Sequence, residues 1–116
     1  MLDSDGAQTG ISIVTVASGL KIVVTQLSVT VDNACSVDVA CRIAFSTSTT
    51  MPTASTTGVN GVLLAHAGIA AGSGQVIGSG SGIIGIGADD EDLRYTCEDP
   101  VGGSLNITVS YYTIET

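Results

Sequence analysis

Two runs of alternating apolar and polar residues, joined by a turn sequence, dominate the last quarter of the chain. A period of two is typical of a β-strand with one apolar face. Residues 99–103 between the runs read DPVGG, where proline and glycine favour a turn. The pattern predicts a β-hairpin within residues 92–116 whose apolar face must be covered by a second sheet. Its apolar positions are Leu93, Tyr95 and Cys97 in the first run and Leu105, Ile107, Val109 and Tyr111 in the second.

The rest of the chain predicts further strands over residues 10–16, 20–32, 36–46, 61–66, 75–79 and 83–86. In the second of these, the apolar phase of Ile22 and Val24 resumes one position late at Leu27. This slip predicts a β-bulge or a change of sheet near Thr25 and Gln26. A turn at residues 32–35 predicts a second hairpin. Its following strand is expected to point Val37, Val39, Cys41, Ile43 and Phe45 inward and Asp38, Ala40, Arg42 and Ala44 outward.

These patterns amount to about eight strands and no helix in 116 residues. We therefore expect one all-β domain, an antiparallel β-sandwich of jelly-roll-like form, over residues 10–116. Residues 1–9 are polar and are expected to form an N-terminal arm. An immunoglobulin-like sandwich is the alternative, but the chain has no tryptophan for the Cys, Trp, Cys pattern of that fold. Residues 47–60 form a long Ser/Thr-rich loop, either a binding loop or a disordered one.

The charge balance is acidic, with eleven acidic against three basic residues and a formal net charge of −8. Phosphate backbones are repelled by such a chain, so a nucleic-acid partner is not expected. The basic residues are Lys21, Arg42 and Arg94, and the arginines fall on polar strand faces where surface ion pairs are expected. Neither a membrane span nor a signal peptide is predicted. Because only 12 % of the residues are charged, we expect part of the surface to be buried against other copies or a larger partner.

Cysteines and the single histidine suggest structural roles. Cys41 and Cys97 fall on apolar strand faces, which predicts buried free thiols, with a disulfide as the alternative. Cys35 falls in a predicted turn and is expected to be the most reactive thiol. The odd count of three fits assembly in a reducing cytoplasm. His66 could form a nucleophile dyad with a cysteine but is more typical of a structural histidine, and no zinc-type spacing is present.

Two further motifs were considered as ligand sites. Residues 80–85 match GxGxxG, but a dinucleotide site needs a helix after these glycines, and none is predicted. The acidic run at residues 89–92, with Glu98 and Asp99, could supply oxygen ligands for calcium, although a contiguous run is more typical of a solvated loop. A hydrolase acting through acidic residues is a third possibility, against which the scarcity of aromatic residues counts. We expect no catalytic, cofactor-binding or metal-binding residues.

The segment from residue 63 to 115 resembles small all-β virion proteins of tailed bacteriophages, those that decorate or cement the capsid or build head and tail fibres. The similarity lies in HAGIAAGSG (66–74), ADDEDLR (88–94), CEDPVGGS (97–104) and VSYYTIE (109–115). Members of this family are typically jelly rolls that trimerise.

This resemblance implies a non-enzymatic capsid decoration protein that binds the outer shell of a phage head and stabilises it. The implied partners are two further copies of the chain, giving a homotrimer, and the major capsid protein. The protein would be assembled in the host cytoplasm and carried on the virion surface. The alternative is a receptor- or carbohydrate-binding module of a fibre or tail, acting through loop 47–60 and the acidic loop 89–92 on a host surface glycan.

Overall fold

The computed structural model describes residues 2–4, 6–50, 62–79 and 81–115, and these contain nine strands and no helix. The strands are β1 Leu2–Ser4, β2 Gln8–Val14, β3 Leu20–Val31, β4 Val39–Ser46, β5 Val62–Ile69, β6 Gly74–Ile77, β7 Gly85–Ile86, β8 Asp92–Cys97 and β9 Leu105–Glu115. Most of the predicted strands are therefore present, with ends shifted by a few residues.

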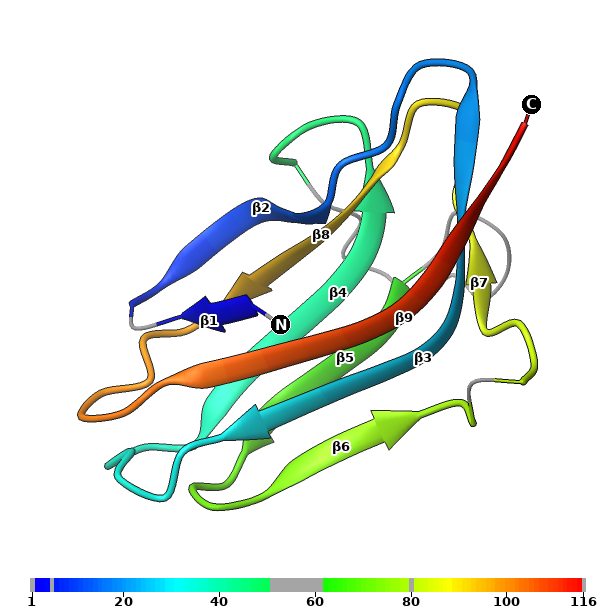
Figure 1. The fold of residues 1–116 in the computed structure, drawn as a ribbon. Coiled ribbons are helices and arrows are strands. Elements are labelled where there is room, and N and C mark those ends of the chain that lie inside the picture. Colours follow the sequence, from blue (N-terminus) through cyan, green and yellow to red (C-terminus); the bar gives the residue numbers. More distant parts are fainter. Residues whose placement is uncertain (1, 5, 51–61, 80, 116) are drawn as a thin grey trace.

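The strands form two antiparallel sheets that face each other across a core (Figure 1). One sheet has the order β1-β9-β3-β6, with β7 also paired to β3, and the other has the order β2-β8-β4-β5. The pairs β1–β9, β2–β8, β3–β6 and β4–β5 are nested, as in one long hairpin folded across itself. This is the connectivity of a jelly roll. The prediction of an all-β antiparallel sandwich of jelly-roll-like form is confirmed.

Both predicted hairpins are wrong, although their strands are present. β8 and β9 belong to different sheets, and so do β3 and β4, so each intervening turn crosses from one sheet to the other. The two turns lie side by side, since the amide of Ser36 donates to the carbonyl of Val101 at 2.8 Å. Alternation shows only that each strand has one apolar face. A hairpin and an inter-sheet connection meet that requirement equally well.

The predicted bulge is confirmed at Thr25. In the β3–β9 ladder Val24 pairs with Tyr111 and Gln26 with Ser110, which leaves Thr25 as the extra residue. The bulge rotates the strand by one position, so that residues on both sides of it reach the same core. Ile22, Val24, Leu27, Val29 and Val31 are all buried.

The core is aliphatic, with the single phenylalanine, Phe45, buried among strands of both sheets. The inward positions predicted for β4 are buried except Val37, which is 41 % exposed because the strand begins only at Val39. Ala44, predicted to face outward, is fully buried. Its small side chain stands in register between the larger residues Arg94 and Val62.

The N-terminal residues take part in both sheets. β1 pairs with β9 through Leu2, Asp3 and Ser4, and β2 begins at Gln8. Residues 2–4 and 8–9 of the predicted arm 1–9 thus belong to strands of the sandwich. The predicted loop 47–60 is described as far as Thr50, and its remaining residues lie outside the described part of the chain.

Candidate functional site

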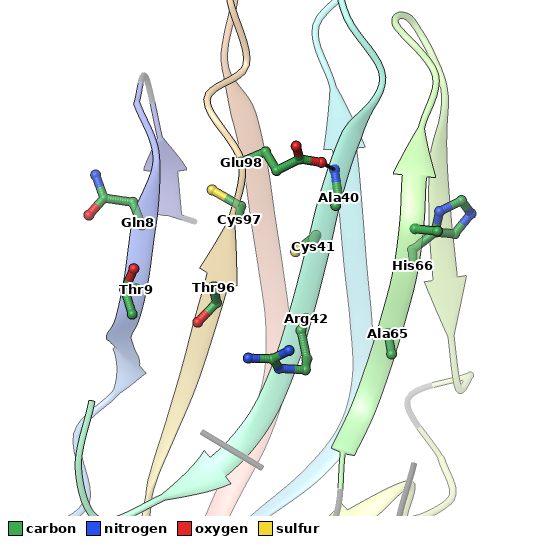
Figure 2. Close-up of a pocket in the computed structure, with 11 residues that line it drawn as sticks. Gln8, Thr9, Ala40, Cys41, Arg42, Ala65, His66, Thr96, Cys97 and Glu98 are labelled. Atoms are coloured by element: carbon green, nitrogen blue, oxygen red, sulfur yellow. Dashed lines mark hydrogen bonds between the residues drawn. The ribbon is translucent and has the colours of Figure 1, made fainter. Parts of the chain in front are cut away.

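A shallow groove of about 420 Å³ lies on the outer face of the β2-β8-β4-β5 sheet (Figure 2). Side chains on this face alternate with those that point into the core, because successive residues of a strand face opposite sides. Residues of all four strands line the groove, among them Gln8, Thr9, Ala40, Arg42, Ala65 and Thr96. Four of these six side chains are polar, and the two alanines are small, so the groove is shallow between them.

Arg42 occupies the middle of the groove. It stands in register with Thr96 of β8 on one side and Ala65 of β5 on the other. Its Nε is buried and has no hydrogen-bond partner among the described residues. The other two cations are paired, Lys21 with Asp89 at 3.6 Å and Arg94 with Asp92 at 3.3 Å. An ion pair is therefore found for Arg94, but it is mostly buried and not at the surface as expected, and no ion pair of Arg42 is found among the described residues.

Two polar groups at the rim of the groove already accept backbone hydrogen bonds. The Glu98 carboxylate accepts the amide hydrogen of Ala40 at 3.1 Å, and the Thr96 hydroxyl oxygen accepts that of Gly10 at 3.0 Å. The Glu98 side chain is thereby held beside the backbone of β4 and above the level of Arg42 (Figure 2). Within the described residues, the Nε of Arg42 is the buried side-chain polar atom of the groove that has no hydrogen-bond partner.

His66 does not act on the groove as a base. Its ring points away from Arg42 and toward the outside of β5 (Figure 2). Its Nδ1 accepts the amide hydrogen of Gly68 at 3.1 Å. The structural role expected for this histidine agrees with that contact.

The three cysteines are buried free thiols, as predicted for Cys41 and Cys97. Cys41 pairs with Cys97 of β8 and with His66 of β5 in the sheet. Burial, and to a lesser degree the neighbouring Cys97, raises the pKa of the Cys41 thiol to about 12. At neutral pH this thiol stays protonated, so a Cys41–His66 nucleophile pair is not formed.

Cys35, expected to be the most reactive thiol, is buried like Cys41 and Cys97, and its reactivity stays a prediction. Cys35 is only 8 % exposed because the two inter-sheet turns pack against each other over it. Its sulfur lies 3.7 Å from the carbonyl oxygen of Pro100, in the other turn. A side chain on Gly103 would collide with this sulfur, which explains the glycine at that position.

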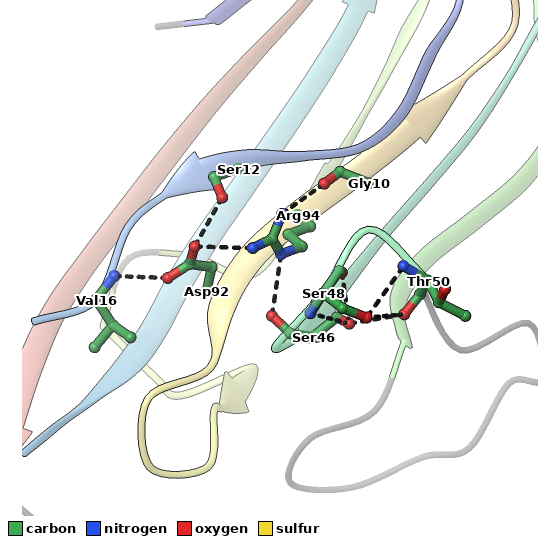
Figure 3. A network of polar contacts seen from close by, with 8 residues as sticks. All are labelled: Gly10, Ser12, Val16, Ser46, Ser48, Thr50, Asp92 and Arg94. Carbon is green, nitrogen blue, oxygen red and sulfur yellow. Dashed lines mark hydrogen bonds and ion pairs between the residues drawn. The ribbon is translucent and has the colours of Figure 1, made fainter. Parts of the chain in front are cut away.

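A second polar cluster joins three strands at the far end of the same sheet (Figure 3). The guanidinium of Arg94 donates to the carbonyl oxygens of Gly10 at 2.7 Å and Ser46 at 3.2 Å. Asp92 accepts from the Ser12 hydroxyl at 2.8 Å and from the Val16 amide at 2.9 Å. Because every member has protein partners, this cluster fastens β2 and β4 to β8 and leaves no open ligand position.

The acidic run 89–92 does not gather around one point. Asp90 accepts the amide hydrogen of Gly19 at 3.1 Å, and Glu91 accepts that of Ala88 at 2.8 Å. Asp89 pairs with Lys21, and Asp92 belongs to the Arg94 cluster. Each carboxylate thus stabilises a different part of the loop. In the described part of the chain no group of three or more His, Cys, Asp and Glu side chains is placed to hold a metal ion.

The glycine-rich run leads into β7 and not into a helix, so it lacks the geometry of a dinucleotide site. The glycines that follow serve close packing. Gly85 lies against Leu63 and Gly87 against Phe45, and a Cβ at either position would collide with these side chains.

The free edge of β9 is a second candidate surface. β1 covers this edge only at residues 105–107, and no other described strand pairs with it from residue 108 to 115 (Figure 1). This stretch carries exposed apolar side chains, Tyr111 at 48 %, Tyr112 at 47 % and Ile114 at 39 %. Such an edge is a template for pairing with another chain.

Backbone hydrogen bonds show which residues of β9 point toward the free edge. The carbonyl of Ser104, just before β9, accepts the amide hydrogen of Asp32, just after β3. Backbone groups of successive residues point to opposite sides of a strand, so the even-numbered residues of β9 direct their amide and carbonyl groups toward β3. On the other side of the bulge, the carbonyls of Ile22 and Val24 accept amide hydrogens from residues 87 and 84, next to β7, and so point away from β9. Thr113 and Tyr111 stand opposite Ile22 and Val24 in the ladder, so their backbone amide and carbonyl groups point away from β3. The amide and carbonyl groups at 109, 111, 113 and 115 point outward.

Comparison of the chain with protein-family models, curated proteins and solved structures gives no match. The described residues include no helix that is long and apolar enough to cross a membrane. Sequence analysis did not identify Arg42 and Thr96 as site residues. Their outward phase on two strands was visible, but their adjacency depends on the order of strands in the sheet.

Proposed function

We propose that this protein is a non-enzymatic structural virion protein, a capsid decoration (cement) protein that binds the outer shell of a tailed-phage head and stabilises it. The observation that carries the proposal is the free edge of β9, residues 108–115, with its exposed tyrosines. An edge of this length usually carries protection such as proline, lysine or a bulge. Here the only charged residue in the stretch is Glu115. An unprotected edge of this kind suits a protein that functions in an assembly.

Decoration works through many weak contacts made together. A protein that sits over junctions between capsid subunits gains avidity, because several copies bind at once. We propose a homotrimer, since a trimer on a threefold junction meets three equivalent surfaces of the major capsid protein. Low charge and exposed apolar residues support such contacts. The virion surface would be its site of action, after assembly in the host cytoplasm.

The proposal is tested by measuring the mass of the purified protein by light scattering and by mixing it with capsids stripped of their minor proteins. A trimer that rebinds the shells and raises the temperature at which they break is the expected result. A monomer that neither binds shells nor protects them would overturn the proposal.

A second candidate is a receptor- or carbohydrate-binding module of a fibre or tail. The groove with its unpaired Arg42 favours it, because a small ligand could be held there. A glycan array separates the two roles. Saturable binding of one glycan class by a protein that ignores shells would favour the module.

A further inference from the structure

We propose that the groove on the β2-β8-β4-β5 sheet binds the carboxylate of an acidic sugar residue, with Arg42 as the anchoring side chain. This inference rests on the second candidate function and is independent of the decoration role. It is drawn from the charge of Arg42, the polar side chains around it and the size of the groove.

Arg42 needs a partner that the described residues do not supply. Its Nε is buried without a hydrogen bond among the described residues, and a buried donor left unpaired is destabilising. Lys21 and Arg94 show that cations elsewhere in this acidic protein are neutralised by carboxylates. An incoming carboxylate would complete the same kind of pair at Arg42, and a guanidinium can hold it through two parallel hydrogen bonds.

A carboxylate fits the groove better than a phosphate group does. Arg42 is the only cation among the residues that line the groove, and Glu98 stands at its rim. With a net charge of −8 on the chain, a doubly charged phosphate would face stronger repulsion than a singly charged carboxylate. One guanidinium also balances one carboxylate in charge and in shape.

The remainder of the groove fits a sugar ring. Thr9 carries a hydroxyl group and Gln8 an amide, which can both donate to and accept from sugar hydroxyls. Ala40, Ala65 and Ala67 form a low apolar strip on which the carbon–hydrogen face of a ring can lie. The volume of about 420 Å³ has room for one or two sugar residues. An acidic peptide would form fewer hydrogen bonds with the hydroxyl groups of the groove than a sugar would.

The test is an NMR titration of ¹⁵N-labelled full-length protein with digalacturonate, observing the amides of β4 and β8 and the Nε–H signal of Arg42. The matched ligand is the methyl ester of the same disaccharide, which keeps the ring and removes the charge. Acetate and N-acetyl-aspartyl amide are titrated at the same concentrations. We expect saturable shifts around Arg42 with digalacturonate, and much weaker shifts with the other three ligands.

The matched protein variants are Arg42→Gln, Arg42→Lys and Lys21→Gln. Arg42→Gln should weaken binding about tenfold to a hundredfold, the range of a charge-assisted hydrogen bond to a buried group. Arg42→Lys should recover part of the loss, because it keeps the charge without the planar fork. Lys21→Gln removes an equal charge from the start of β3, in the other sheet, and should leave binding unchanged. Melting curves of each variant establish that it is folded.

Several results would overturn the inference. Equal shifts with acetate would mean that the site takes any carboxylate and reads no sugar. Preference for the aspartyl compound would assign the groove to an acidic peptide. An equal loss of binding in Lys21→Gln would reduce the effect to long-range charge. If a glycan array instead finds only neutral sugars, the binding-module function stands and the assignment of Arg42 to a carboxylate falls.

Discussion

Cys41 of β4 and Cys97 of β8 lie directly opposite each other in the ladder, at a position where the two backbones exchange no hydrogen bonds. The next pair along the ladder, Ala40 and Glu98, is hydrogen-bonded, since the amide of Glu98 donates to the carbonyl of Ala40 at 3.0 Å. Hydrogen-bonded and non-hydrogen-bonded pairs alternate along an antiparallel ladder. Cα atoms at the intervening positions of an antiparallel pair are about 4.5 Å apart. That separation falls within the range that a disulfide spans.

We predict that a two-electron thiol oxidant such as diamide converts Cys41 and Cys97 into an intramolecular disulfide. Both thiols lose a hydrogen atom, and the diamide is reduced to the hydrazine. Oxidation should be slow in the native protein because both sulfurs are buried. Peptide mass mapping should find the 41–97 link in wild type and in Cys35→Ser, and not in Cys97→Ser. A disulfide that contains Cys35 would contradict the register seen in the sheet.

The raised pKa of Cys41 predicts a loss of stability at alkaline pH. Below about pH 8.5 the thiol is protonated in both the folded and the unfolded chain, so it leaves stability unchanged. Above that pH the unfolded thiol ionises, while the folded one holds its proton up to about pH 12. The free energy of unfolding should therefore fall by about 1.4 kcal/mol per pH unit over this window.

Urea denaturation from pH 7 to 10.5 measures this slope. Cys41→Ala removes the titrating thiol, so the difference in slope between variant and wild type isolates the contribution of this one group. Parallel curves for the two proteins would show that the Cys41 thiol does not hold its proton.

The Asp92–Arg94 cluster should contribute far more to stability than the Lys21–Asp89 pair. Asp92→Asn removes the charge that Arg94 and the Ser12 hydroxyl contact, in a region where both charged side chains are about one-sixth exposed, at 15 % and 16 %. We expect a loss of about 1–3 kcal/mol. Asp89→Asn, at a well exposed pair, should cost less than about 1 kcal/mol. Thermal unfolding of the two variants provides the comparison, and equal losses would mean that the cluster adds no specific stabilisation.

Strand positions and most apolar faces could be predicted because they are local properties, although Tyr111, predicted on the apolar face of its strand, is 48 % exposed. The bulge was visible as a one-residue slip between Val24 and Leu27, because a regular strand would point these two residues to opposite faces of the sheet. By contrast, the sheet to which a strand belongs depends on partners far away in the chain. β8 pairs with β2 and β4, and β9 with β1 and β3, although a turn of a few residues joins β8 to β9.

The same distinction explains the site residues. Cys35 was expected to be the most reactive thiol because it lies in a turn, but a second turn, at Pro100, packs over it and buries it. Arg42 looked like one more surface arginine of a polar strand face. Its unpaired state follows from the strand order, which sets the uncharged Ala65 and Thr96 beside it in the ladder. Neither neighbour could be inferred from the residues around position 42.

The free edge of β9 gives a sharp test of assembly through a matched pair of proline variants. The amide of Thr113 points outward, so Thr113→Pro should keep the pairing with β3 while blocking the addition of another strand. The amide of Ile114 points toward β3, opposite Lys21, so Ile114→Pro removes a hydrogen bond within the sheet. We expect Thr113→Pro to be monomeric by light scattering, to rebind shells poorly, and to unfold within about 1 kcal/mol of wild type. Ile114→Pro should lose more stability than that. If Thr113→Pro forms the same oligomer as wild type, the contact between copies lies on another surface. The free edge of β9 would then have no role in oligomer formation.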